Sequence, residues 1–162
     1  MNNSTDQEAI TFYNVPLVCG AAPSIGCGSR AKPLLMELEQ QTPIKEAWLN
    51  RTGTIVAIVW SGQPDTEEIA KRVFERHEIQ YTERPDDKRT DESFRAVGSW
   101  LRGAEVDRLS LEEARVIAET SVSASVRERL VSVEEAAQIK SDIEAYFREE
   151  LVKLRTSHMS LK

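Results

Sequence analysis

The chain has 162 residues, with 21 basic and 27 acidic side chains, and so carries a net charge of −6. This length suffices for one compact domain, or for a small domain with a helical extension. The acidic balance argues against binding to the phosphate backbone of nucleic acids. Residues 1–8 lack the features of a secretory signal and no apolar run is long enough to span a bilayer, so we expect a cytoplasmic protein with reduced thiols.

The first half of the chain alternates between strand-like and helix-like segments. β-Branched and aromatic residues predict the strands, and the Asn-to-Gly turn at 50–53 predicts that the two middle strands form a hairpin. Ser29 is expected to cap a helix that carries Pro33 in its first turn, and the acidic run 65–68 indicates the start of a second helix. The predicted order is strand 10–18, a helix ending near 41, strands 44–49 and 54–60, a helix from 65, and strand 79–82.

This order is the β-α-β-β-α-β pattern of a ferredoxin-like sandwich, in which two helices cover one face of a four-stranded antiparallel sheet. The fold class is therefore α+β, with a ferredoxin-like domain at 10–84. The helix residues expected to face the sheet are Leu34, Leu35 and Leu38 in the first helix, and Ile69, Val73 and Phe74 in the second.

The second half of the chain is expected to be helical, with a helical domain at 91–156 that follows a charged linker at 86–92. A short helix is predicted over 92–102. Ser110-Leu-Glu-Glu and Ser132-Val-Glu-Glu both have the pattern of a capping box, so each predicts the start of a longer helix. The last helix carries an apolar stripe made of Ile139, Ile143, Phe147, Leu151 and Leu154. This stripe packs within the chain, or it forms a homodimer through the C-terminal helices.

The loop between the first strand and the first helix holds both cysteines of the chain, Cys19 and Cys27. Free backbone N–H groups and the positive end of a helix dipole favour a thiolate at Cys27, and the glycines of the loop let it fold back toward Cys19. In a reducing compartment, such a pair is more typical of metal binding or redox chemistry than of a permanent disulfide. We expect the functional site here.

The element order and the position of this loop resemble the heavy-metal-associated domain, a ferredoxin-like metallochaperone module. The resemblance covers about residues 10–84. A Met-x-Cys-x-x-Cys motif binds a soft ion in that family, so the resemblance implies that Cys19 and Cys27 are metal ligands. The spacing here is Cys-x7-Cys, and Leu17 stands where the motif has Met. The implied ion is Cu(I), which two thiolates suit, or zinc, which would need further ligands.

Other interpretations of the same loop remain open. Cys27 is the reactive thiol of a redox or sulfur-transfer protein and Cys19 its resolving partner, or both cysteines are structural in a non-catalytic assembly module. A further alternative is an anion or cofactor cradle made by the loop amides and two nearby basic side chains. Its residues are Gly26, Gly28, Ser29, Arg30 and Lys32. No hydrolytic triad is found, and no catalytic residue is assigned.

Overall fold

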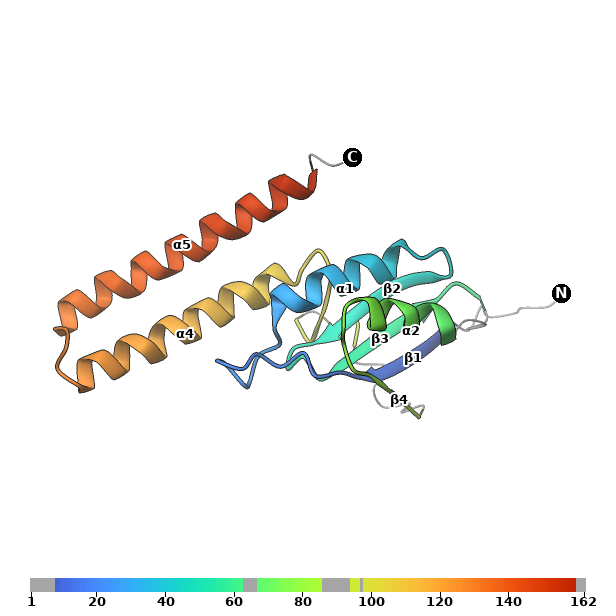
Figure 1. Cartoon of the computed structure of the whole chain (residues 1–162), viewed down its shortest axis with the longest axis horizontal. Coiled ribbons are helices and arrows are strands. Elements are labelled where there is room, and N and C mark those ends of the chain that lie inside the picture. Colours follow the sequence, from blue (N-terminus) through green and yellow to red (C-terminus); the bar gives the residue numbers. More distant parts are fainter. Residues whose placement is uncertain (1–7, 63–66, 86–93, 97, 160–162) are drawn as a thin grey trace.

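The computed structural model describes residues 8–62, 67–85, 94–96 and 98–159, and the side chains of the last helix as far as residue 150. The chain folds into an α+β structure with two C-terminal helices (Figure 1). The elements are β1 (Ala9–Asn14), α1 (Gly28–Gln40), β2 (Ile44–Asn50), β3 (Ile55–Trp60), α2 (Glu67–Arg76), β4 (Thr82–Arg84), β5 (Trp100–Arg102), α4 (Asp107–Arg127) and α5 (Val133–Met159).

The strands form one antiparallel sheet in the order β4-β1-β3-β2-β5. The first four have the ferredoxin-like order, which confirms the predicted fold class, and β5 extends the sheet beside β2. β3 is apolar over its whole length because it lies between β1 and β2, where both of its faces are covered.

Helices α1 and α2 lie against one face of the sheet (Figure 1). Leu34, Leu35 and Leu38 of α1 are completely buried, and Val73 and Phe74 of α2 are buried as predicted. These side chains meet the inward residues of β1 and β3, so the main core lies between the two helices and the sheet. The predicted start of the second helix at 65 lies outside the described residues.

The second face of the sheet is covered by aromatic side chains from the segment that follows β4. Phe94 and Trp100 pack on Phe12 and Trp48, with ring centroids 5.7–6.3 Å apart. The prediction of a helix over 92–102 is wrong, because Trp100–Arg102 pair with β2 as the fifth strand. Trp100 and Arg102 are two residues apart and so share the face that lies on this aromatic cluster, whereas Leu101 points to the opposite face and is buried in the main core. The predicted linker 86–92 lies outside the described residues.

Two predicted strand boundaries and the predicted place of Pro33 also differ from the structure. β1 ends at Asn14 instead of Val18, and the chain beyond it follows the β2–β3 turn, to which the Val15 and Leu17 amides donate. The last strand of the sandwich is Thr82–Arg84 rather than 79–82, since Ile79 is buried against the end of α2. Pro33 is the sixth residue of α1, so it lies beyond the first turn.

The C-terminal helices α4 and α5 form an antiparallel hairpin that reaches past one end of the sandwich (Figure 1). The capping box at Ser132 is confirmed, since its hydroxyl accepts from the Glu135 amide while the Glu135 carboxylate accepts from the Ser132 amide. The one predicted at Ser110 is wrong, because α4 already begins at Asp107 and its N-cap is Val106.

Candidate functional site

The loop with both cysteines is held against the turn that joins β2 to β3. The Val15 and Leu17 amides donate to the carbonyls of Thr54 and Gly53, each at 2.9 Å. The end of the loop that leads into α1 is bonded to the same turn, because the Gly26 amide donates to the Arg51 carbonyl at 2.9 Å. The loop therefore has a defined path on both sides of its tip.

Between these ties the loop folds back on itself as a narrow antiparallel pair centred on Val18 and Gly26. The Cys19 amide donates to the Ile25 carbonyl at 3.0 Å, and the Cys27 amide donates to the Leu17 carbonyl at 2.6 Å. Since side chains alternate between the two faces of such a pair, Cys19 and Cys27 point to the same face from diagonal positions. Diagonal positions are about 7–8 Å apart. The fold-back expected from the glycines is present, and both thiols are free.

Cys27 is the N-cap residue of α1, with extended backbone angles φ −78° and ψ 98°. Its side chain is half-buried, and its Sγ lies 3.4 Å from the Ser29 hydroxyl. The prediction that Ser29 caps the helix is therefore wrong, because Gly28 is already the first helical residue and no side chain caps α1. A thiol at this position meets the positive end of the helix dipole and remains open to solvent on one side.

Cys19 has the opposite environment. It is buried, and its thiol donates a hydrogen bond to the Glu113 carboxylate of α4 at 2.9 Å. Burial, and next the bond to Glu113, raise the pKa of the Cys19 thiol above its ordinary value. Cys19 is thus held in its protonated form. Sequence reasoning missed Glu113, which lies 94 residues further along the chain and was assigned to a capping box.

The start of α4 is anchored on this loop and on α1. Lys32 forms a part-buried ion pair with Asp107 at 3.0 Å, and Arg51 pairs with Glu112 at the turn between β2 and β3. A Cβ atom on Gly28 would lie 2.2 Å from the Ser110 hydroxyl oxygen, so only glycine allows α4 to approach this closely. Glu113 therefore reaches Cys19 from a helix whose position is fixed by contacts on either side.

The five residues of the predicted anion cradle do not converge on one point in the structure. The charge of Lys32 already faces Asp107, the Gly26 amide is used by Arg51, and Gly28 lies beneath α4. Ser29 and Arg30 are exposed. Of this set, the structure brings Ser29 next to a thiol and leaves Arg30 on the surface.

A zinc ion would need four ligands in a tetrahedral arrangement. Among the described residues, no three His, Cys, Asp or Glu side chains are grouped to hold one metal ion. His77 hydrogen-bonds to Glu37, at the contact between α1 and α2. The donor set thus does not fit zinc. A two-thiolate Cu(I) site would also have to displace the proton that Cys19 shares with Glu113, and binding of Cu(I) stays a prediction.

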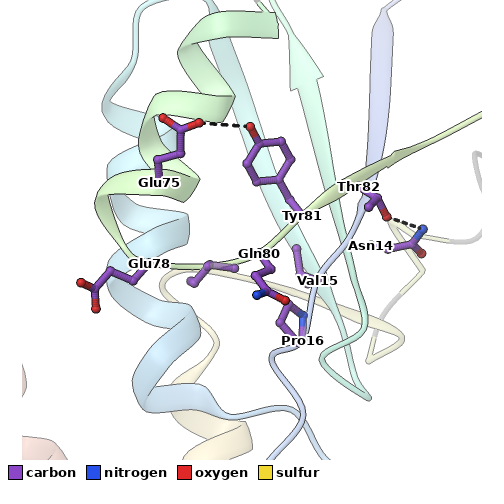
Figure 2. A pocket seen from close by; sticks show the side chains of 9 residues that line it. Asn14, Val15, Pro16, Glu75, Glu78, Gln80, Tyr81 and Thr82 are labelled. Carbon is purple, nitrogen blue, oxygen red and sulfur yellow. Dashed lines mark hydrogen bonds between the residues drawn. The ribbon is translucent and has the colours of Figure 1, made fainter.

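An open groove of about 860 Å³ lies beside β4 (Figure 2). The groove has an apolar floor and a rim with two carboxylates, and Tyr81 on that rim donates to Glu75 at 3.4 Å. Its lining residues are Asn14, Val15, Pro16, Glu75, Glu78, Ile79, Gln80, Tyr81 and Thr82. It contains neither cysteine, so the reactive side chains of the loop do not act in this groove.

No helix in the described part of the chain combines the length and the apolar character needed to cross a membrane. Comparison with known proteins finds no protein-family model, no characterised protein and no solved structure that matches this chain.

Proposed function

We propose that this protein carries out thiol–disulfide exchange, with Cys27 as the thiol that meets the substrate and Cys19 as the thiol that resolves the mixed disulfide. The observation that carries the proposal is the difference between the two environments within one loop. Cys27 is half-buried at the N-terminus of α1, where a substrate disulfide can reach it from solvent. Cys19 is buried and protonated, as a resolving thiol must be until the first step is over.

The reaction balances with a small-molecule disulfide as the oxidant. The Cys27 thiolate attacks one sulfur of oxidised glutathione, so a Cys27–glutathione bond forms and one glutathione thiolate leaves. Cys19 then loses its proton and attacks the Cys27 sulfur, which expels the second glutathione. Two protein thiols are oxidised to one disulfide, and one glutathione disulfide is reduced to two thiols.

The second step requires the two thiols to approach each other. Diagonal positions at about 7–8 Å are slightly too far apart for the Cα atoms of a disulfide, which lie at about 4.4–6.8 Å. The movement would have to lengthen the bond from the Cys19 amide to the Ile25 carbonyl, next to Gly20, where the chain is exposed and an added Cβ atom would meet nothing within 4 Å. A shift of the loop tip can therefore close the bond while the anchored ends at Val15 and Gly26 stay in place.

The test is to treat the reduced full chain with oxidised glutathione and to identify the products by mass spectrometry. The wild type should lose two hydrogen atoms and retain no glutathione. Cys19→Ser should stop at one glutathione adduct on Cys27. Cys27→Ser should form no disulfide within the chain, and glutathione should add to its Cys19 more slowly than to Cys27 in Cys19→Ser. A wild type that only accumulates the mixed disulfide would overturn the proposal. A parallel Cu(I) titration with a competing chelator tests the metal interpretation, which would be favoured by uptake that either substitution abolishes.

A second proposal concerns assembly, and it is based on the surface of α5. Ala136 is the sole buried side chain between 133 and 150 of this helix, whereas Val133 is 69% exposed, Tyr146 61% and Phe147 38%. Of the predicted apolar stripe, Ile139 and Phe147 are each 38% exposed and Ile143 is half-buried, so the stripe is partly uncovered as far as it is described. Leu151 and Leu154 lie outside the described side chains.

We propose that a second copy of the hairpin covers this stripe. Two antiparallel helices leave one side of each helix open, and a second pair of the same kind completes a four-helix bundle. Lys140, Glu144 and Arg148 border the stripe with charges of both signs, and Lys140 and Glu144 pair with Glu119 and Arg115 of α4 in the same hairpin. A highly charged partner of one sign would not match this border.

The oligomeric state of the full chain, measured by light scattering after gel filtration, tests the second proposal. The wild type should be a dimer, and Tyr146→Glu and Ile139→Glu should be folded monomers. Ala145→Glu is the matched control, because residue 145 lies two and a half turns from Ala136 and so on the opposite side of α5. A monomeric wild type, or a dimer that survives the substitution on the stripe at Ile139 and the one beside it at Tyr146, would contradict it.

A further inference from the structure

Within the described residues, Glu113 is the side chain that hydrogen-bonds to the Cys19 thiol. Its Oε1 lies 2.9 Å from the Cys19 sulfur, although the two residues belong to opposite halves of the chain. The contact is not an accident of a loose surface helix. The first two turns of α4 are fixed by the part-buried pair of Lys32 with Asp107 and by the close packing of Ser110 on Gly28.

We propose that Glu113 is a catalytic base, which takes the proton from Cys19 as this thiol attacks the mixed disulfide on Cys27. The inference rests on the proposed thiol–disulfide exchange. In that step the proton moves from the Cys19 sulfur to Glu113 Oε1, and the sulfur electron pair forms the bond to Cys27. The bond between Cys27 and glutathione breaks, and glutathione leaves with the electron pair and is protonated by solvent.

The physical reason is the need to form a thiolate at a buried position. Only the thiolate attacks a disulfide, and burial together with Glu113 raises the pKa of Cys19, so few Cys19 residues are ionised at neutral pH. A base within hydrogen-bond distance removes this difficulty, because it accepts the proton during the attack. The carboxylate then becomes neutral as the bond forms, and no isolated negative charge remains on the buried sulfur.

The experiment compares Glu113→Gln with Glu119→Gln in the full chain. Gln has the size of Glu and one oxygen that can accept the hydrogen bond from the Cys19 thiol, but its amide cannot take up the proton. Glu119 is the matched control because it lies on the same helix and is exposed, and it touches Lys140 rather than the loop. The two steps are followed separately by quenching with acid and counting the mixed disulfide and the closed disulfide by mass spectrometry.

We expect Glu113→Gln to slow the closing step by about 100-fold and to leave the formation of the mixed disulfide unchanged. The rate of closing in Glu113→Gln should rise with pH, since hydroxide or water must then take the proton, whereas the wild-type rate should depend much less on pH. Glu113→Asp should recover part of the rate. A merely structural role for Glu113 would not produce this change in the pH profile.

Two different failures can be told apart. If the wild type closes its disulfide and Glu113→Gln does so at the speed and pH dependence of Glu119→Gln, the role of Glu113 is overturned and the proposed exchange stands. If the wild type never closes the disulfide, the exchange itself is overturned and the role of Glu113 with it. Circular dichroism of each variant establishes that α4 is still folded.

Discussion

The ammonium group of Lys32 lies 3.0 Å from one carboxylate oxygen of Asp107 and 3.2 Å from the other. This ion pair joins the second turn of α1 to the first turn of α4, and Asp107 is the only charged residue that is buried among those described. It thereby fixes the point at which the C-terminal hairpin leaves the sandwich. The same point determines where Glu113 meets Cys19.

The first prediction is that Lys32→Met destabilises the protein by about 1–3 kcal/mol. Removing one partner of a fully buried ion pair costs about 3–5 kcal/mol. The loss expected here is smaller than that, because Lys32 is 24% exposed and its charge is partly screened by water. Urea unfolding followed by circular dichroism measures the change. Lys45→Met is the control, since Lys45 pairs with Glu8 at the surface and its loss should cost less than about 1 kcal/mol. Equal losses in both variants would contradict the role of the part-buried pair.

The second prediction concerns stability at alkaline pH. Burial and the bond to Glu113 raise the pKa of the Cys19 thiol in the folded chain above its value in the unfolded chain. The folded protein therefore keeps this proton where the unfolded chain has lost it. Its contribution to the free energy of unfolding is complete below about pH 8.5 and is lost as the pH rises through the raised pKa.

Urea titrations between neutral and alkaline pH check this prediction. Cys27→Ser, which retains Cys19, should lose stability above about pH 8.5 with a slope of up to about 1.4 kcal/mol per pH unit. Cys19→Ser should lack that part of the decline, and lysines and tyrosines that titrate in both variants cancel in the difference. Parallel curves for the two variants would show that Cys19 holds no proton beyond its ordinary range.

The third prediction is that Gly53→Ala damages the thiol loop as well as the turn it belongs to. Gly53 has φ +74°, and a Cβ atom there would lie 2.3 Å from the Leu17 carbonyl oxygen. Left-handed backbone costs a non-glycine residue about 1–2 kcal/mol, and relieving this clash must also displace the loop. We therefore expect a larger loss of stability than for Gly62→Ala.

Gly62 is the matched control because its φ is +94° but nothing lies within 4 Å of the added Cβ atom. The displaced loop should also expose Cys19, so iodoacetamide should modify Cys19 faster in Gly53→Ala than in the wild type. In Gly62→Ala, iodoacetamide should modify Cys19 at the wild-type rate. If alkylation of Cys19 were unchanged in Gly53→Ala, the contact between Leu17 and Gly53 would not hold the loop in place.

The fold was predictable because local signals and long-range packing agree over the first half of the chain. The apolar run 55–60, the turn at 50–53 and the leucines of α1 each favour the element that forms. The segment 100–102 was misassigned because a run of three residues does not distinguish a helix from a strand. Its strand conformation comes from pairing with β2, which no local pattern reports.

The candidate site was half predictable for a similar reason. Cys19 and Cys27 lie eight residues apart, and the glycines between them indicate a loop that folds back. Glu113 could not be found because nothing in its neighbourhood marks it as the partner of a thiol in the other half of the chain. Only the position of α4, which depends on Asp107 and Ser110, brings the carboxylate to Cys19.

The last prediction uses two segments of nearly the same sequence, Ser-Leu-Glu-Glu from 110 and Ser-Val-Glu-Glu from 132. Ser132→Ala should destabilise the protein by about 1 kcal/mol, because the Ser132 hydroxyl accepts from an amide of the first turn of α5 that has no partner within the helix. Ser110→Ala should change the stability by less than about 0.5 kcal/mol, because α4 begins at Asp107 and Ser110 caps nothing. Urea unfolding gives both values, and hydrogen exchange at the Glu135 amide reports fraying of α5 directly. Equal losses in the two variants would mean that α4 starts at Ser110 in solution, with its first turn and the pair of Lys32 with Asp107 unformed.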